Sequence, residues 1–222
     1  MTNSKRILIW AITIILLGGA IWGMYQLAAS SRIDVTGDIN PVVDSDWQAG
    51  NKNANAVLME YGDFQCPACA AYYPIVRELI DKNGSEFLFV SRNFPLPQHA
   101  NAKSSAYAAG ASGKQGKFWE MHNMLYENQN AWSAVANPEN LYIGYAQSIG
   151  LNIDQFKIDI KSAEVKDKVE ADKNSGIKAG VQATPTFLLN GKRIQPKSYE
   201  EFVTAIRQIN ESTPTPSVGA SN

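Results

Sequence analysis

The sequence predicts an α/β fold with a helical insertion, preceded by one N-terminal transmembrane helix. Apolar runs bounded by turn signals predict buried strands at 56–59, 86–94 and 186–189. The long stretch 98–178 between the second and third of these strands carries apolar residues at helical spacing. An apolar segment at 7–28 is long enough to cross a membrane. These observations predict a sheet whose strands flank a block of helices.

The N-terminal segment has the features of a membrane anchor. Lys5 and Arg6 precede an apolar stretch at 7–24 whose helical length is about 27 Å, enough to cross a hydrocarbon core. We expect residues 1–6 in the cytoplasm, 7–28 as a single-pass anchor and the rest outside, because positive charge marks the cytoplasmic side. A cleaved signal peptide is the alternative, with 28–30 as a possible cleavage site. Its apolar region is usually only about 7–15 residues long, which favours an uncleaved anchor.

The remaining flanks are polar. Residues 29–50 predict a linker, in which 33–35 and 42–43 are candidates for short edge strands. Residues 211–222 are rich in Pro, Ser and Thr and predict a disordered tail. The formal net charge is −1, which gives no reason to expect nucleic acid as a partner. An extracytoplasmic location places the cysteines where disulfides are made and kept.

Both cysteines lie where the first predicted strand gives way to a helix, in the sequence Cys66-Pro-Ala-Cys69. The first turn of a helix has unpaired N–H groups and partial positive charge, which would lower the pKa of the Cys66 thiol. Pro67 suits the first helical position because its missing N–H would have had no partner there. Cys69 lies one turn further on the same face, within reach of Cys66. The spacing therefore predicts a redox-active pair.

Two other interpretations of the cysteine pair are weaker. A structural disulfide would close a very short loop, which contributes little stability. A zinc site would need two more nitrogen or sulfur ligands, and His99 and His122 are not at ligand spacing. We therefore expect no metal and no other cofactor.

Several motifs together carry a family resemblance. The stretch 55–69 strongly resembles the active-site region of the DsbA-like branch of the thioredoxin superfamily. Pro74 matches a proline that kinks the active-site helix in many thioredoxin-fold proteins. The stretch 180–192 is similar to the family's cis-proline loop, following strand and hairpin turn, and 116–129 is similar to the helical insertion of this branch. The resemblance covers roughly 50–209.

The resemblance implies the domain organisation. It predicts a thioredoxin-like domain formed by 51–97 and 179–210, with 98–178 as a helical insertion. Within the second part, Asn190-Gly191 predicts a two-residue hairpin turn. Ser198 begins a capping box that predicts the start of the last helix.

The resemblance also implies the site residues. Pro185 is expected in the cis form, presenting the Thr184 backbone beside Cys66, where family members pair with an extended substrate. Glu60 matches the position of an acid beneath the disulfide. A desolvated carboxylate there has a raised pKa and can relay the proton of Cys69. The alternative for Glu60 is a strand-end acid that faces water.

Other polar residues near the motif have simpler expectations. Asp63 is expected to be a solvated loop acid, although it lies close enough to influence the site. His99 and His122 are expected on the surface or in helix packing.

The implied activity is that of a thiol–disulfide oxidoreductase, foremost a dithiol oxidase acting on reduced exported proteins. A quinone-linked membrane partner of the DsbB or VKOR type would reoxidise it. Pro67-Ala68 offers no basic side chain, which predicts a mild oxidant. Alternatives are a reductase for cytochrome or metal-site maturation, a disulfide isomerase, which would need dimeric arms that 30–55 is too short to supply, and a non-enzymatic metal-delivery module.

Overall fold

The computed structural model describes residues 10, 18, 19 and 41–212. The predicted cytoplasmic end, almost all of the 7–28 anchor and the candidate strand at 33–35 lie outside the described residues. Among the residues that are described, no helix has the length and apolar character needed to span a membrane. Residues 1–34 and 35–222 separate into two units, and the elements described below belong to the second.

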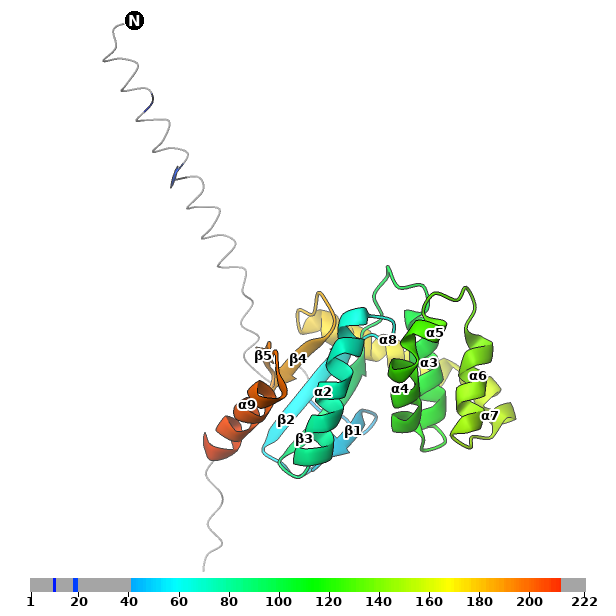
Figure 1. Cartoon of the computed structure of the whole chain (residues 1–222), viewed down its shortest axis with the longest axis horizontal. Coiled ribbons are helices and arrows are strands. Elements are labelled where there is room, and N and C mark those ends of the chain that lie inside the picture. Colours follow the sequence, from blue (N-terminus) through cyan, green and yellow to red (C-terminus); the bar gives the residue numbers. More distant parts are fainter. Residues whose placement is uncertain (1–9, 11–17, 20–40, 213–222) are drawn as a thin grey trace, which may run out of the picture. The chain divides into compact units, whose positions relative to one another are not determined.

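A five-stranded mixed sheet forms the centre of this unit, in the order β1-β3-β2-β4-β5 (Figure 1). β2 and β3 are parallel, and the other neighbouring pairs are antiparallel. The strands are β1 (Trp47–Gly50), β2 (Ala56–Gly62), β3 (Phe87–Asn93), β4 (Thr186–Leu189) and β5 (Lys192–Ile194). Near-continuous burial of β2, β3 and β4 explains their unbroken apolar runs, because helices cover both faces of the sheet.

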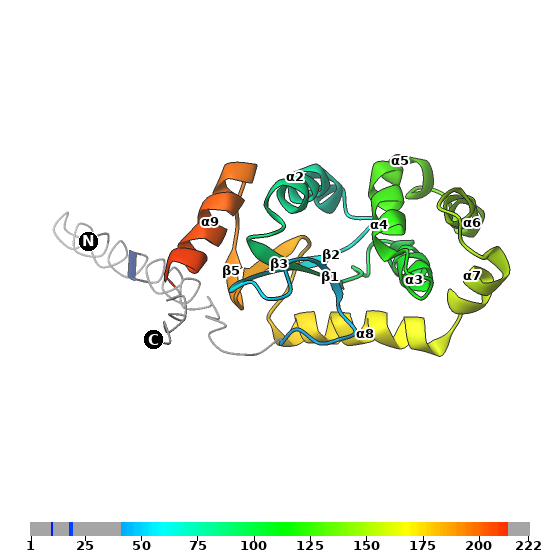
Figure 2. The same ribbon diagram turned by 90° about the horizontal axis from the view of Figure 1, so that it is seen from below.

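Helices lie on both faces of the sheet. In Figure 2, α2 (Pro67–Asn83) and α9 (Tyr199–Ser212) lie on one face, and α8 (Ala163–Lys178) lies on the other. The apolar side of α9 is buried through Phe202 and Ile206. The predicted turn at Asn190-Gly191 is present, with both φ angles positive, at 47° and 78°. Such angles suit the tight turn that joins β4 to β5.

The helical insertion has its own core beside the sheet. Its large buried side chains include Trp132, Tyr142 and Phe156. Ala106 and Ala109, on the first helix of the insertion, are small enough to let neighbouring helices approach closely. The helices that precede α8 are α3 (Ala102–Gly113), α4 (Phe118–Glu127), α5 (Gln129–Trp132), α6 (Glu139–Ser148) and α7 (Ile153–Asp159).

The flanks differ from the sequence-based expectation in three places. Residues 47–50 of the predicted linker form β1, which pairs with β3, and Trp47 stacks on Phe118 with ring centroids 4.2 Å apart. The strand expected at 42–43 does not form, because Val43 enters a turn in which its N–H donates to Asp46. At the C-terminus, α9 continues to Ser212, and the rest of the predicted tail lies outside the described residues.

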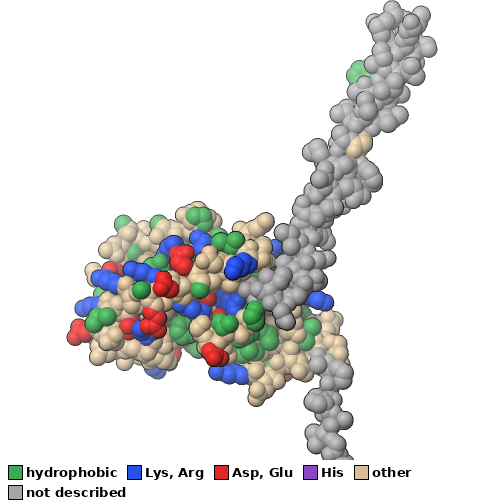
Figure 3. All heavy atoms as spheres, turned by 180° about the vertical axis from the view of Figure 1, so that it is seen from behind, with side chains coloured by type: hydrophobic (Ala, Val, Ile, Leu, Met, Phe, Trp, Pro, Cys, Tyr) green, Lys and Arg blue, Asp and Glu red, His purple; other side chains and the backbone are tan. Residues whose placement is uncertain are grey.

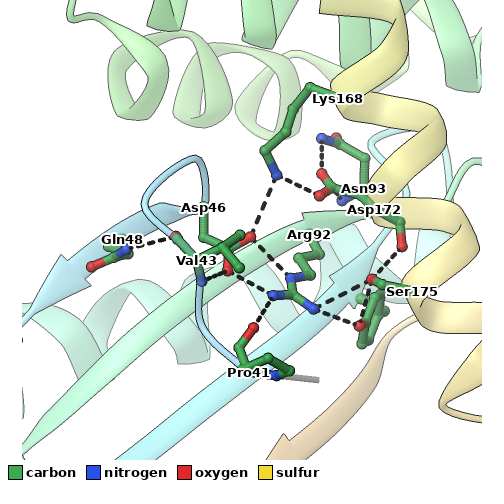
Figure 4. A network of polar contacts seen from close by, with 10 residues as sticks. Pro41, Val43, Asp46, Gln48, Arg92, Asn93, Lys168, Asp172 and Ser175 are labelled. Carbon is green, nitrogen blue, oxygen red and sulfur yellow. Dashed lines mark hydrogen bonds and ion pairs between the residues drawn. The ribbon is translucent and has the colours of Figure 1, made fainter. Parts of the chain in front are cut away.

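The charged sequence of 163–178 is typical of a helix that faces solvent, but one side of α8 is buried. A buried polar network joins it to β3 and to the segment before β1 (Figure 4). Arg92 donates to both oxygens of Asp46, at 3.0 and 2.7 Å. Lys168 contacts Asp46 at 3.4 Å and pairs with Asp172. Asp172 in turn accepts from the backbone and side chain of Asn93, both at 3.1 Å. The network therefore holds the segment that leads into β1 against the sheet and α8.

The outer surface carries charges of both signs. On the face seen in Figure 3, Lys and Arg side chains are interspersed with Asp and Glu side chains over the described residues. That face therefore presents no extended region of one charge.

Candidate active site

The local sequence places Cys66 at the tip of α2. β2 ends at Gly62, a short loop follows, and α2 begins at Pro67 with Cys66 as its N-cap residue. The backbone of Cys66 is extended, with φ −71° and ψ 122°, and its N–H donates to the Asp63 carbonyl at 3.0 Å. Pro67 occupies the first helical position without loss of a hydrogen bond. The predicted strand-to-helix junction is therefore present.

The two thiols differ in burial and in acidity. Both are free thiols, and Cys66 is 7% exposed whereas Cys69 is 1% exposed. The pKa of Cys66 is lowered to about 5, chiefly by a hydrogen bond from the Cys69 thiol, against the opposing effect of burial. Burial, followed by the hydrogen bond to Cys66 and the charge of Glu60, raises the pKa of Cys69 well above its usual value. Near neutral pH, Cys66 is therefore a thiolate and Cys69 a thiol.

Further donors stabilise the Cys66 thiolate. The Thr184 side chain and the backbone N–H groups of Cys69 and Ala68 also lower the Cys66 pKa. The Thr184 hydroxyl is buried and otherwise has no partner within 41–212, so it is available to the sulfur. The N–H groups belong to the first turn of α2, where they have no helical acceptor. Partial positive charge at a helix tip is the physical basis of the sequence-based prediction.

The predicted proline loop lies against Cys66. The Thr184–Pro185 peptide bond is cis, and the Thr184 carbonyl oxygen lies 3.4 Å from Cys66 Sγ. β4 starts directly after this loop, at Thr186, which pairs with Tyr61 in β2. The antiparallel pairing of β4 with β2 therefore holds the loop beside the end of the strand that leads to Cys66.

Glu60 is buried beneath the cysteines and does not face water. It is 6% exposed, and its pKa is raised to about 8, chiefly by burial and then by the negative charge of Cys66. Glu60 borders a cavity of about 190 Å³ between α2 and α4. Tyr73, Val76, Trp119, His122 and Tyr126 also line this cavity. A side chain at position 62 would approach the Glu60 carboxyl and the Tyr126 hydroxyl to 3.2 Å, so a residue without Cβ suits this position.

Asp63 corrects one expectation, and His99 is its partner. Asp63 is not a solvated loop acid, because it is only 2% exposed. Its carboxylate accepts from the Gln65 N–H at 2.8 Å, the Leu96 N–H at 3.0 Å and His99 Nδ1 at 2.7 Å. Its own N–H lies 3.5 Å from Cys69 Sγ. A signal for this role is the Asp-x-polar pattern before the helix, which is typical of a side chain that bonds the backbone two residues on.

The insertion supplies residues that the sequence did not single out. Gln129 Nε2 donates to the carbonyl oxygens of Phe64 at 2.7 Å and Cys66 at 3.0 Å. Gln65 Nε2 donates to the Ser133 carbonyl at 2.7 Å. The helical insertion thus holds the loop that carries Cys66. A polar residue in a helical stretch gives no sequence signal for this role.

His122 lies in a ring cluster next to the site. Burial lowers its pKa to about 4, so the imidazole is neutral near pH 7. Its ring centroid lies 5.0 to 5.5 Å from those of Tyr126, Trp119 and Phe64. Within 41–212, no group of His, Cys, Asp and Glu residues is arranged to hold a metal ion.

Comparison with known proteins identifies the family. The thioredoxin family model matches residues 43–208. The fold is similar to that of BdbD from Bacillus subtilis, with a TM-score of 0.67 and 25% identity over 80% of this chain and 98% of that one. It is also similar to α-DsbA1 of Wolbachia pipientis, with a TM-score of 0.66 and 22% identity over 77% of this chain and 93% of that one.

Curated relatives match over only part of their length. The chain is 35% identical over 162 residues to the Na⁺/H⁺ antiporter NhaA 1 of Salinispora arenicola, which covers 72% of this chain but 24% of that protein. It is 32% identical over 195 residues to the NhaA antiporter of Herminiimonas arsenicoxydans, covering 30% of it. The chain thus spans less than a third of these relatives. The family match and the fold agree: the chain belongs to the thioredoxin family.

Proposed function

We propose that this protein is a membrane-anchored, extracytoplasmic dithiol oxidase that introduces disulfides into reduced exported proteins. The observation that carries the proposal is the opposite shift of the two thiols, since the pKa of Cys66 is lowered to about 5 and that of Cys69 is raised. Stabilising one thiolate stabilises the reduced enzyme, and a protein whose reduced form is stabilised is an oxidant. The anchor is inferred from Lys5, Arg6 and the apolar segment at 7–28.

The first chemical step opens the enzyme disulfide. A substrate thiolate attacks Cys66 Sγ, the Cys66–Cys69 bond breaks, and its electron pair passes to Cys69 Sγ. The products are a mixed disulfide between substrate and Cys66 and a thiolate at Cys69 that takes up a proton. Glu60 keeps a proton near neutral pH because its pKa is about 8, and it supplies that proton from beneath the site.

The second step releases the oxidised substrate. A second substrate thiolate attacks the substrate sulfur of the mixed disulfide, and Cys66 leaves as the thiolate that the helix tip stabilises. The enzyme is then a dithiol and has gained the two electrons that the substrate lost. A quinone-linked membrane protein of the DsbB or VKOR type would accept these electrons and restore the disulfide.

The substrate backbone would dock along the loop before β4. Thr184 presents its carbonyl group beside Cys66 Sγ, and an extended peptide can hydrogen bond to backbone groups at such an edge. Pro185 fixes the backbone direction of this loop. Recognition of the backbone suits an enzyme that accepts many unfolded clients, because such binding depends on few side chains of the client.

Equilibration of the Cys66/Cys69 pair with glutathione tests the proposal. We expect a reduction potential between about −200 and about −120 mV. The reason is that the Cys66 pKa lies between the thiol pKa values of a strong oxidant and of a reductant. The oxidised protein should also restore activity to a reduced, unfolded client. A potential near about −270 mV would instead identify a reductase and refute the proposed direction.

A further inference from the structure

The Asp63–His99 pair lies directly behind the buried cysteine, and the mechanism above does not use it. We propose that His99 is a positioning residue that, through the Asp63 carboxylate, holds the Asp63 N–H as a hydrogen-bond donor to the Cys69 sulfur that leaves when the disulfide opens. The inference rests on disulfide exchange at Cys66 and Cys69 and holds for either direction of net electron flow.

The Asp63 carboxylate is fully enclosed and held by three donors. Its side chain is 0% exposed, whereas that of His99 is 19% exposed. Two donors are backbone N–H groups, of Gln65 and Leu96, and the third is His99 Nδ1 at 2.7 Å. An ionised carboxylate can only accept, so Nδ1 carries the hydrogen. His99 is therefore the one side chain among these donors, and it can be replaced without altering the backbone.

The peptide groups of Asp63 contact both cysteines. The Asp63 N–H points to Cys69 Sγ at 3.5 Å, and the Asp63 carbonyl accepts the Cys66 N–H at 3.0 Å. Rotation of this residue would therefore remove a donor from one sulfur and shift the backbone of the other cysteine. The side-chain bonds of Asp63 prevent that rotation.

His99 is itself anchored on the opposite side. Its backbone N–H donates to the Leu96 carbonyl at 3.1 Å, and the Leu96 N–H donates to the same Asp63 oxygen that His99 contacts. Two donors from the loop after β3 thus converge on one Asp63 carboxylate oxygen in the loop before α2. Two segments that are far apart in sequence hold the donor in place.

The donor acts on the step in which charge develops on Cys69. As the attacking thiolate bonds to Cys66 Sγ, the disulfide electron pair moves to Cys69 Sγ, which becomes a thiolate before it is protonated. The proton taken up equals the one that the attacking thiol lost when it ionised, so the exchange is balanced. A preorganised N–H aimed at a developing anion lowers the barrier, and a more stable thiolate leaves faster.

Opening of the oxidised protein by dithiothreitol measures this effect directly. His99→Phe keeps a ring but removes the donor, and His99→Asn keeps a donor at the Nδ1 position but removes the ring. We expect His99→Phe to slow the opening rate about tenfold, as loss of one hydrogen bond to a charged sulfur predicts. His99→Asn should stay within about threefold of the unaltered protein.

Two further measurements separate positioning from general loss of structure. Gln98→Ala changes the exposed neighbour of His99 and should leave the opening rate unchanged. Alkylation of reduced Cys66 should stay within about twofold in His99→Phe, because other groups stabilise that thiolate. Equal slowing in His99→Phe and His99→Asn, or an unchanged rate in His99→Phe, would overturn the inference. Neither outcome bears on the glutathione potential, which tests the proposed function separately.

Discussion

The sulfur of Cys66 lies 3.4 Å from the carbonyl oxygen of Thr184, although 118 positions separate the two residues in sequence. Antiparallel pairing of β4 with β2 creates this contact, because the loop before β4 then ends beside the strand that leads to Cys66. The thiolate therefore faces a backbone edge, whereas Cys69 faces the interior.

Replacement of one cysteine should distinguish their roles. Cys69→Ser keeps the nucleophile but removes the thiol that reverses its attack, so it should accumulate mixed disulfides with a disulfide-bonded peptide. Cys66→Ser leaves only a buried thiol with a raised pKa and should form almost none. Non-reducing electrophoresis with mass spectrometry measures the adducts. Equal trapping by both variants would contradict the assigned roles.

The contribution of Cys66 to the stability of the reduced protein should rise with pH between about 5 and 9. The Cys66 pKa falls from 9.0 to about 5 on folding, so the unfolded chain binds more protons across this range. The stabilisation is complete above the unfolded pKa and is lost as pH falls through the folded pKa. Relative to reduced Cys66→Ser, the free energy of unfolding should increase by on the order of 3 kcal/mol from pH 5 to pH 8.

Urea unfolding of both reduced proteins at a series of pH values measures this difference. Subtracting the Cys66→Ser profile removes most of the contribution of other groups that titrate in the same range, Glu60 among them. Parallel profiles for the two proteins would show that folding does not stabilise the Cys66 thiolate.

Glu60→Gln should stabilise the protein at alkaline pH, because Glu60 affects stability with the opposite sign to Cys66. The Glu60 pKa rises from 4.5 to about 8 on folding, so the unfolded chain binds fewer protons and stability declines as pH rises through this range. Gln cannot ionise and avoids this decline. The free energy of unfolding of the variant should exceed that of the unaltered protein by on the order of 3 kcal/mol at pH 8.5.

Denaturant unfolding at pH 5 and pH 8.5 tests the Glu60 prediction. In the oxidised protein the Cys66 charge is absent and burial alone acts, so the gain should be smaller there than in the reduced protein. A gain that is the same at both pH values would indicate an ordinary packing effect and not a raised pKa.

The buried network around Arg92 should control stability without controlling thiol chemistry. Asp46→Asn removes the carboxylate that pairs with Arg92, whose side chain is 4% exposed, and should lower the free energy of unfolding by about 3–5 kcal/mol. The double variant Asp46→Leu with Arg92→Met removes both charges and should lose less. Calorimetry gives the stabilities, and the alkylation rate of Cys66 should not change. A double variant less stable than Asp46→Asn would contradict this account.

The sequence was sufficient to predict the elements that depend on local pattern. The apolar run at 56–59 predicted β2, the Cys66-Pro67 step predicted the start of α2, and Asn190-Gly191 predicted the hairpin turn. Each prediction rests on backbone preferences or burial that neighbouring residues reveal. The cis form of the peptide bond before Pro185 required the family resemblance, because most X–Pro bonds are trans.

Residues whose roles depend on distant partners could not be predicted in this way. β1 has no alternating pattern, and the stacking of Trp47 on Phe118 of the insertion is a tertiary contact. Asp63 finds its imidazole partner 36 positions away, and Gln129 reaches Cys66 across 63 positions. A polar side chain shows its role only when the fold provides its donor or acceptor.

The central claim is that the helix tip stabilises the Cys66 thiolate, and titration of the reduced protein by thiolate absorbance at 240 nm tests it most directly. The variants Cys66→Ser and Cys69→Ser show which sulfur gives each transition. We predict one transition near pH 5, absent from Cys66→Ser, and no ionisation of the second sulfur up to about pH 9. Two similar transitions near about pH 8.5 would contradict the account, because the helix tip would then stabilise neither sulfur.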